Sequence, residues 1–228
     1  MYYFYYIKYS GEFMIISFLN QKGGTAKSTL ARAVAVEFAK NKWQVQIADM
    51  DLTQQTAFKW SIRRAEAGIE PAIDVVVYKD PQTALKAEAL NDLLIVDGKA
   101  FADSHVIDIA KASDLIVLPV GISTDDLQPT LNLAMELVSK GIKRKSIYFV
   151  VCKVLKNGEK EAMTTRSSIE DFNFEVAQGW INMQTAYSQA MDTGRSLTET
   201  RYKDLNQTTD KIIEQIFNKA NSVMNNGE

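Results

Sequence analysis

Two lysines five residues apart stand in a short polar loop, FLNQKGGTAKSTL, at residues 18–30. An apolar run precedes this loop and a helical pattern follows it, which is the setting of a phosphate-binding loop at a helix N-terminus. Gly23 and Gly24 would let the backbone approach phosphate oxygens without a Cβ clash. Lys27 would reach the β- and γ-phosphates, and the hydroxyl of Ser28 would bind Mg²⁺. The loop therefore predicts a nucleotide site.

The loop departs from the strict pattern G-x-x-x-x-G-K-[ST], because Gln21 and Ala26 occupy its glycine positions. Alanine disfavours positive φ, so this turn needs either an ordinary backbone conformation or some strain. The other departure is Lys22, because the ordinary phosphate-loop pattern requires no second lysine at this position. The alternative is a glycine-containing turn with two solvated lysines, but the strand-loop-helix context favours a phosphate site.

Carboxylates end two of the apolar runs. Asp49 and Asp51 close the run in IADMD, and residues two apart on a strand project to the same face. Asp97 ends the run in DLLIVDG, where a carboxylate could hold Mg²⁺ directly or through water. The alternatives are an acidic strand end that caps the next helix, with Thr53 as N-cap, and a simple Asp-Gly turn. The phosphate loop upstream favours a role for these carboxylates in the nucleotide site over either alternative.

Short apolar runs alternate with helical patterns along the whole chain. Strands are predicted at residues 14–19, 45–49, 73–78, 93–97, 115–120 and 147–152. Helices are predicted near residues 27–40, 53–67, 103–112, 125–140 and 206–224. The runs are apolar on both alternating faces, which indicates an α/β fold in three layers, with helices on both faces of a mostly parallel twisted sheet.

Length and composition favour one domain. The chain has 228 residues, and we expect a single domain at 14–228 after an N-terminal extension at 1–13, a loosely ordered tail. The net charge of -2 argues against a surface built wholly for nucleic acid, but leaves room for a basic patch. The single cysteine, Cys152, cannot form an internal disulfide, and no run reaches the roughly 18 apolar residues of a membrane span. We expect a soluble, cytoplasmic protein.

At the loop the chain resembles the deviant Walker A motif, K-G-G-x-G-K-[ST], of the ParA/MinD family of P-loop ATPases. The likeness covers residues 14–217 and is nearest to the small plasmid-partition ParA type, and Lys22 corresponds to the signature lysine of the family. The resemblance implies that two ATP-bound subunits face each other and that Lys22 reaches the partner's phosphates. It further implies that Asp51 orients the attacking water.

The resemblance also implies ATP or ADP and Mg²⁺ as ligands. The implied nucleotide contacts are Lys22, Gly23, Gly24, Thr25, Ala26, Lys27, Ser28 and Thr29. The implied Mg²⁺ site is Ser28, Asp49 and Asp97, and the implied catalytic residues are Lys22, Lys27 and Asp51. Adenine contacts would come from the loop after residue 152 and from residues 179–184.

Three functions remain open. The first is a partition ATPase that dimerises on ATP, binds DNA nonspecifically and moves a plasmid or chromosome with a centromere-binding, ParB-like adaptor; it would be nucleoid-associated when ATP-bound. The second is a MinD-like positioning ATPase with a membrane-binding C-terminal helix. The third is a P-loop amide ligase resembling dethiobiotin synthetase, for which the sequence marks no substrate pocket. A nitrogenase-type iron protein is excluded, because its cluster needs more thiolates than one cysteine supplies.

The C-terminal region bears on the choice between DNA and membrane. The apolar residues of the helix near 206–224 share one face, but its other face carries too few cations for an anionic membrane, so we expect it to pack on its own domain. In relatives the DNA contacts are basic residues near these helices. Here they would be Arg195, Arg201 and Lys203, with Lys211, and residues 143–145 form a second basic cluster.

Overall fold

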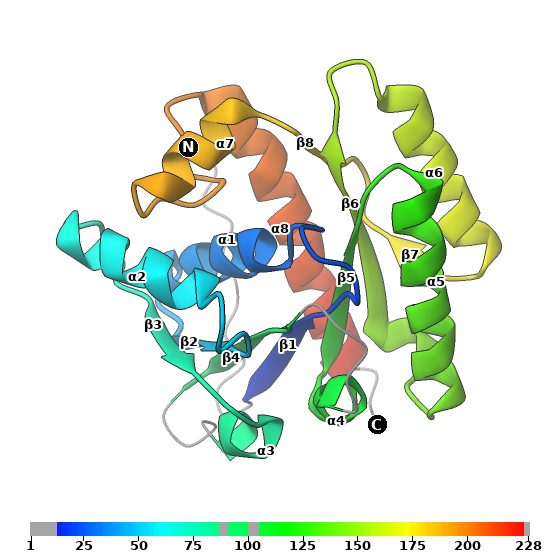
Figure 1. The fold of residues 1–228 in the computed structure, drawn as a ribbon, viewed down its shortest axis with the longest axis horizontal. Coiled ribbons are helices and arrows are strands. Elements are labelled where there is room, and N and C mark those ends of the chain that lie inside the picture. Colours follow the sequence, from blue (N-terminus) through cyan, green and yellow to red (C-terminus); the bar gives the residue numbers. More distant parts are fainter. Residues whose placement is uncertain (1–12, 87–90, 100–104, 226–228) are drawn as a thin grey trace.

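The centre of the molecule is a parallel sheet (Figure 1). A computed structural model describes residues 13–86, 91–99 and 105–225. The strands are β1 (Met14–Phe18), β2 (Val45–Asp49), β3 (Asp74–Val77), β4 (Leu93–Asp97), β5 (Leu115–Val120), β6 (Ile147–Val154), β7 (Glu175–Val176) and β8 (Ile181–Asn182). Their order is β3-β2-β4-β1-β5-β6-β7, and β8 pairs with β6. The expected α/β fold and its six expected strands are confirmed, whereas β7 and β8 are additions.

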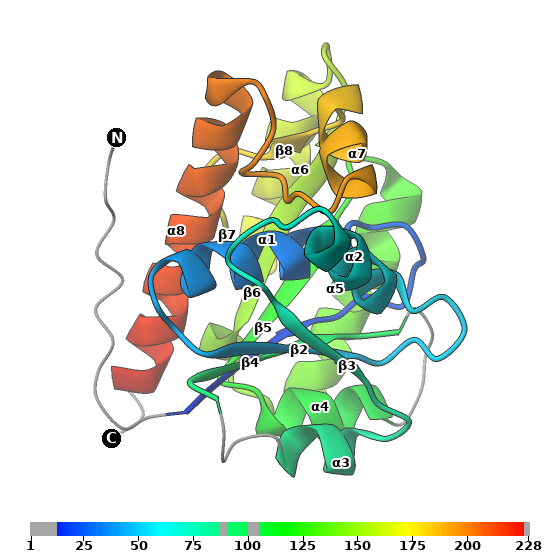
Figure 2. The same cartoon turned by 90° about the vertical axis from the view of Figure 1, so that its left-hand side faces the viewer.

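Helices cover both faces of the sheet (Figure 2). They are α1 (Lys27–Lys40), α2 (Thr56–Glu66), α3 (Pro81–Ala84), α4 (His105–Ala112), α5 (Thr124–Ser139), α6 (Glu159–Asp171), α7 (Thr185–Asp192) and α8 (Lys203–Asn225), with a 3₁₀ turn η2 (Arg144–Ser146) before β6. Core residues from α1, α2, α7 and α8 pack on one face, hereafter the α1 face. Core residues from α3, α4, α5 and α6 pack on the other, hereafter the α5 face.

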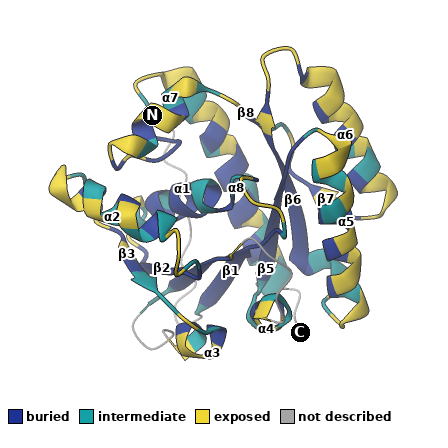
Figure 3. Ribbon diagram, viewed as in Figure 1, coloured by how far each residue is buried: buried dark blue, intermediate teal, exposed yellow. Residues whose placement is uncertain are grey.

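The central strands are mostly apolar because both of their faces are covered by helices (Figure 3). Along β1, Met14, Ile16 and Phe18 pack on the α1 face and Ile15 packs on the α5 face. All five residues of β1 are buried, as are all five of β2 and of β4. Successive residues of a central strand thus pack alternately in the core of the α1 face and in the core of the α5 face.

Helix α8 packs on its own domain, as expected. The apolar positions Ile212, Ile213, Ile216, Phe217 and Ala220 are all buried on the α1 face. Phe217 makes edge contacts with the rings of Phe38 and Trp43. Within the described part of the chain, we find no helix with the length and apolar character needed to cross a bilayer.

Some local expectations differ from the structure. Helix α2 begins at Thr56, so Thr53 is not its N-cap, and the residue before the helix is Gln55 in a left-handed conformation. Helix α6 lacks a strong apolar stripe and was not expected. The extension at residues 1–13 lies, apart from Phe13, outside the described residues.

Candidate functional site

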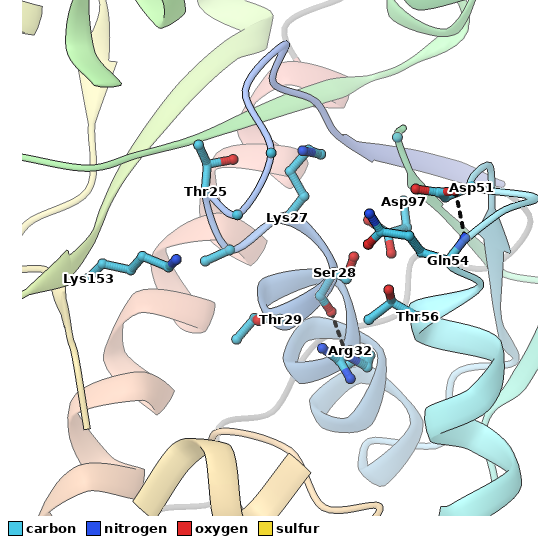
Figure 4. Close-up of a pocket in the computed structure, with 14 residues that line it drawn as sticks. Thr25, Lys27, Ser28, Thr29, Arg32, Asp51, Gln54, Thr56, Asp97 and Lys153 are labelled. Atoms are coloured by element: carbon cyan, nitrogen blue, oxygen red, sulfur yellow. Dashed lines mark hydrogen bonds between the residues drawn. The ribbon is translucent and has the colours of Figure 1, made fainter. Parts of the chain in front are cut away.

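The register of three strands brings the predicted residues together. Phe18, the last residue of β1, pairs with Asp97 of β4, and Asp97 pairs with Asp49 of β2. Parallel strands end at one edge, so the loop after β1 meets both carboxylates there. A cavity of about 240 Å³ lies at this edge, lined by residues 23–29, Asp51, Asp97, Arg32 and Lys153 among others (Figure 4).

Gly98 allows the close approach of β4 to the start of the loop. Its N–H donates to the carbonyl of Phe18 at 3.0 Å. A Cβ at this position would lie 2.6 Å from Cδ2 of Leu19 and 2.9 Å from the Phe18 carbonyl oxygen. The glycine after Asp97 is therefore required by packing against the loop.

The phosphate loop adopts a left-handed backbone at Ala26, a conformation that favours glycine. Ala26 has φ 79° and ψ 19°, which is the left-handed conformation that alanine disfavours by about 1–2 kcal/mol. Gly24 has φ 73°. Lys27 opens α1, is buried, and donates from Nζ to the carbonyl of Lys22 at 3.1 Å. Burial lowers the pKa of Lys27, and the charges of Asp97 and Asp51 oppose that shift.

Asp97 and Ser28 have the chemistry of a magnesium site. Asp97 is 3% exposed, and among the described residues its Oδ1 has no hydrogen-bond partner. Burial raises its pKa to about 7; a hydrogen bond with Ser28 opposes this and the charge of Asp49 adds to it. In the described part of the chain no three His, Cys, Asp or Glu side chains form a metal cluster. Mg²⁺ suits such a site, since it uses one or two protein ligands with phosphates and waters.

Asp49 is directed toward α2. Its Oδ2 accepts hydrogen bonds from the N–H groups of Ala57 and Phe58 at 3.0 and 3.2 Å, and its Oδ1 accepts one from the N–H of Asp51 at 3.0 Å. Burial raises the pKa of Asp49, and these backbone hydrogen bonds limit the shift. The side chain thus satisfies the first N–H groups of α2 and orients the loop that carries Asp51. These contacts give Asp49 a positioning role, and its expected place in the Mg²⁺ site stays a prediction.

Asp51 lines the cavity and shapes its own loop. Its Oδ1 accepts hydrogen bonds from the N–H groups of Thr53 and Gln54 at 3.0 and 2.9 Å. Figure 4 shows Asp51 and Asp97 on the same side of Lys27. The carboxylate of Asp51 is therefore held at the wall of the cavity that Lys27 and Asp97 also line.

Lys22 is directed away from the cavity of its own chain. Its Nζ lies 2.5 Å from Oδ1 of Asp126 and donates to the carbonyl of Asp125 at 3.3 Å. Both partners belong to the first turn of α5, where Ser123 is the N-cap. Burial would raise the pKa of Asp126, but Lys22 and Ser123 hold it below its ordinary value. The trans role of Lys22 stays a prediction.

Two cations at the cavity were missed in the sequence. Arg32 is 4% exposed, donates from Nε to the carbonyl of Ser28 at 2.7 Å, and lies over the ring of Trp60. Burial lowers its pKa to about 10. The sequence signal for Arg32 was its position in a largely apolar stretch of helix, four residues after Ser28. Lys153 was the lone charge at the end of an apolar run.

Two of the expected DNA residues lie on the loop between α7 and α8, which α2 holds in place, and the third, Lys203, begins α8. Arg195, Arg201 and Lys203 are exposed. Buried Arg64 forms a bidentate pair with Glu199, with N–O distances of 2.7 and 3.0 Å. The structure thereby fixes the loop that carries Arg195 and Arg201, with Lys203 at the start of α8, without testing their role.

Two further contacts anchor this region, and Arg144 in the 143–145 cluster also has contacts within the protein. Arg64 donates to the carbonyl of Gly194 at 3.0 Å, and Nε1 of Trp60 donates to the carbonyl of Arg195 at 2.9 Å. In the 143–145 cluster, Arg144 is engaged by the Phe172 carbonyl at 2.8 Å and by the Phe174 ring. Arg144, one of the three cations of this cluster, therefore already has partners within the protein.

The fold and the loop at its carboxyl edge define a P-loop nucleotide-binding protein. The chain belongs to the CobQ/CobB/MinD/ParA nucleotide binding domain family, whose model matches residues 16–225. The suspected family is thus confirmed. No curated protein matches the chain.

Solved structures of this type share the fold at low identity. A plasmid partition protein from Borrelia burgdorferi B31 bound to AMPPNP has a TM-score of 0.69 at 17% identity, covering 91% of this chain and 100% of that one. MinD from Pyrococcus horikoshii OT3 with Mg-ADP has a TM-score of 0.68 at 16% identity, covering 90% and 96%. The MinC:MinD complex of Aquifex aeolicus has a TM-score of 0.70 at 12% identity, covering 90% and 96%. At these identities the likeness establishes the fold alone.

Proposed function

We propose that this chain is a Mg²⁺-dependent ATPase of the DNA-partition type, which binds ATP or ADP, dimerises on ATP and binds DNA nonspecifically. The observation that carries the proposal is the phosphate loop with buried Lys27, beside the unpartnered Oδ1 of Asp97 and the hydroxyl of Ser28. The nucleotide-bound structures that share the fold support it.

Each residue of the site would have its own role in phosphoryl transfer. Lys27 and the N–H groups of residues 23–29 would bind the phosphates, and Ser28 with Asp97 would hold Mg²⁺. Bound Mg²⁺ would neutralise charge that develops on the phosphate oxygens. Asp51 orients the attacking water, and Lys22 of a second subunit supplies a further cation to the phosphates. Hydrolysis is then tied to dimerisation.

The choice of DNA over membrane rests on α8 and on the loop before it. The apolar face of α8 is already buried, so it offers no apolar surface to a bilayer. The loop before α8 presents exposed Arg195 and Arg201 on a backbone anchored by Arg64 and Glu199. A dimer doubles this patch, and phosphate contacts give affinity that requires no base sequence. The cargo would be a plasmid or chromosome, carried with a ParB-like adaptor in the cytoplasm at the nucleoid.

Co-sedimentation of the full chain with bare DNA and with anionic liposomes tests this function. We expect DNA binding with ATP and Mg²⁺, little with ADP, and none to liposomes. Affinity should fall with salt by a log–log slope of about -0.9 per phosphate contacted. Liposome binding without DNA binding would favour the MinD-like alternative, and ATP hydrolysis with neither would favour the ligase.

A pair of variants locates the DNA surface. Arg195→Ala with Arg201→Ala should weaken binding to every DNA sequence and flatten the salt slope, without changing ATP-driven dimerisation. Lys143→Ala with Lys145→Ala removes the same number of charges from the other cluster and should change DNA binding less. The reverse order would move the contact surface to residues 143–145.

A further inference from the structure

Lys153 occupies a bulge at the end of β6. Cys152 pairs with Ile181 and Val154 pairs with Asn182, so two steps along β6 match one step along β8. Lys153 is the additional residue, and its φ of 59° is left-handed. A bulge of this kind re-aims a side chain and often lies beside an active site.

The bulge separates Lys153 from two cores. Residues along β6 alternate between the faces: Val150 and Cys152 pack on the α1 face, and Val151 packs on the α5 face. Val154 also packs on the α5 face, although in a regular strand it would share the face of Cys152. The extra residue thus keeps both neighbours buried and leaves Lys153 as the exposed residue of the strand. A left-handed lysine is strained, and such strain gathers at functional sites.

The ammonium of Lys153 is directed to the phosphate loop. A Cβ built on Gly24 would lie 3.6 Å from Nζ of Lys153, and Lys153 lines the same cavity as Lys27 and Thr29. Among the described residues, this ammonium makes no hydrogen bond or ion pair. Lys153 acts on the carboxylate of Asp126 through its charge, but Asp126 is already paired with Lys22. The ammonium of Lys153 is therefore available in the cavity to bind an anionic ligand.

The position along the cavity indicates which anion. In Figure 4 the carboxylates of Asp51 and Asp97 lie on one side of Lys27, and Lys153 lies on the other. If Mg²⁺ is held by Asp97, a phosphate chain bound to Lys27 would have its terminal end on the carboxylate side and would extend from there toward Lys153. We propose that Lys153 is a nucleotide-binding residue, which supplies a second ammonium from the same chain to the phosphates of the bound nucleotide. This inference rests on the proposed nucleotide binding. It means that a single subunit carries two phosphate-binding lysines before Lys22 of a partner arrives.

Titration of the full chain with Mg-ADP, which needs no dimer, tests the proposal. Lys153→Gln removes the charge but leaves a slightly shorter polar side chain on the same left-handed backbone, whereas Lys153→Arg keeps the charge. We expect Lys153→Gln to weaken ADP binding about fivefold at low salt and less at high salt, because screening reduces the contribution of an exposed charge. Lys153→Arg should bind ADP nearly as wild type does, and adenosine should not distinguish the variants.

Lys156→Gln is the matched control, since it removes an exposed lysine three residues further along and away from the cavity lining. It should bind ADP as wild type does, and equal melting temperatures establish that all variants fold. Equal ADP affinities of wild type and Lys153→Gln at low salt would overturn the inference while leaving nucleotide binding intact. A wild-type chain that binds no ADP would overturn the proposed function and this inference together.

Discussion

Nζ of Lys22 lies 2.5 Å from Oδ1 of Asp126 within the same chain. If Lys22 reaches a partner's nucleotide, this ion pair has to break first. The two side chains are 42% and 25% exposed, so the pair contributes no more than about 1 kcal/mol. It is weak enough to open on dimerisation and strong enough to oppose it measurably.

Asp126→Asn should strengthen the ATP-dependent dimer about fivefold, because two such pairs break for each dimer formed. The asparagine can still accept the hydrogen bond from Ser123, so the start of α5 is preserved. Analytical ultracentrifugation with ATP measures the dissociation constant. Asp125→Asn is the control, since only the backbone carbonyl of Asp125 contacts Lys22. Equal constants for all three proteins would mean that the pair does not restrain Lys22.

Lys22→Ala should leave a folded monomer that binds ADP but does not dimerise on ATP. The physical reason is that the lost charge belongs to the nucleotide site of the partner. Light scattering of wild type and Lys22→Ala, each with ATP and with ADP, measures whether the dimer forms. A dimer that persists with unchanged hydrolysis would reduce Lys22 to a solvated loop residue.

Asp51→Asn should bind ATP and dimerise while its turnover falls at least about 100-fold, because water positioning is separable from phosphate binding. Asparagine retains the oxygen that accepts the N–H groups of Thr53 and Gln54, so the loop keeps its shape. Phosphate release measures turnover, and direct titration measures binding. Lys27→Ala should instead weaken nucleotide binding itself. Turnover near that of wild type in Asp51→Asn would remove Asp51 from its role.

Ala26→Gly should raise the free energy of unfolding by about 1 kcal/mol, since glycine adopts φ 79° without strain. For a chain of this size the midpoint of thermal unfolding should rise by about 2–4 °C. Ala39→Gly, within α1, is the matched control and should lower stability by about 1 kcal/mol, because a glycine inside a helix is unfavourable. A loss of stability in Ala26→Gly would show that the alanine methyl group contributes more by packing than it costs in strain.

Glu199→Gln should lower the free energy of unfolding at pH 7 by about 3 kcal/mol, because it leaves buried Arg64 without a counter-charge. Burial would raise the pKa of Glu199, but Arg64 and Lys40 hold it below its ordinary value of 4.5. A lowered pKa stabilises the fold above about pH 4.5, and this contribution is lost as the pH falls through the folded pKa. Urea unfolding at several pH values should therefore show the difference from wild type shrinking in acid.

Glu66→Gln, at an exposed position of α2, serves as the control for the loss of a carboxylate and should change stability by less than about 0.5 kcal/mol. Equal stabilities of wild type and Glu199→Gln at pH 7 would contradict the role given to the pair.

Local patterns in the sequence were sufficient to predict the sheet and the phosphate loop. The strands were visible because a parallel strand covered on both faces is apolar at nearly every position, as in β1 and in β4 before its terminal Asp97. The loop was visible because Gly23, Gly24, Lys27 and Ser28 are neighbours in the chain. Their chemistry requires only the strand before them and the helix after them.

The tertiary structure alone decided which distant groups complete the site. Lys22 meets α5 more than 100 residues later, with a separation of 103 to Asp125, and Arg64 meets Glu199 across 135 residues. Lys153 reaches the loop because β8 forces a bulge into β6, and no feature of residues 147–154 themselves predicts that pairing. The sequence by itself determined the parallel sheet, the phosphate loop and the carboxylates at the strand ends, since each follows from neighbouring residues. Partners such as these depend instead on strand order and register, which arise only when the whole core packs.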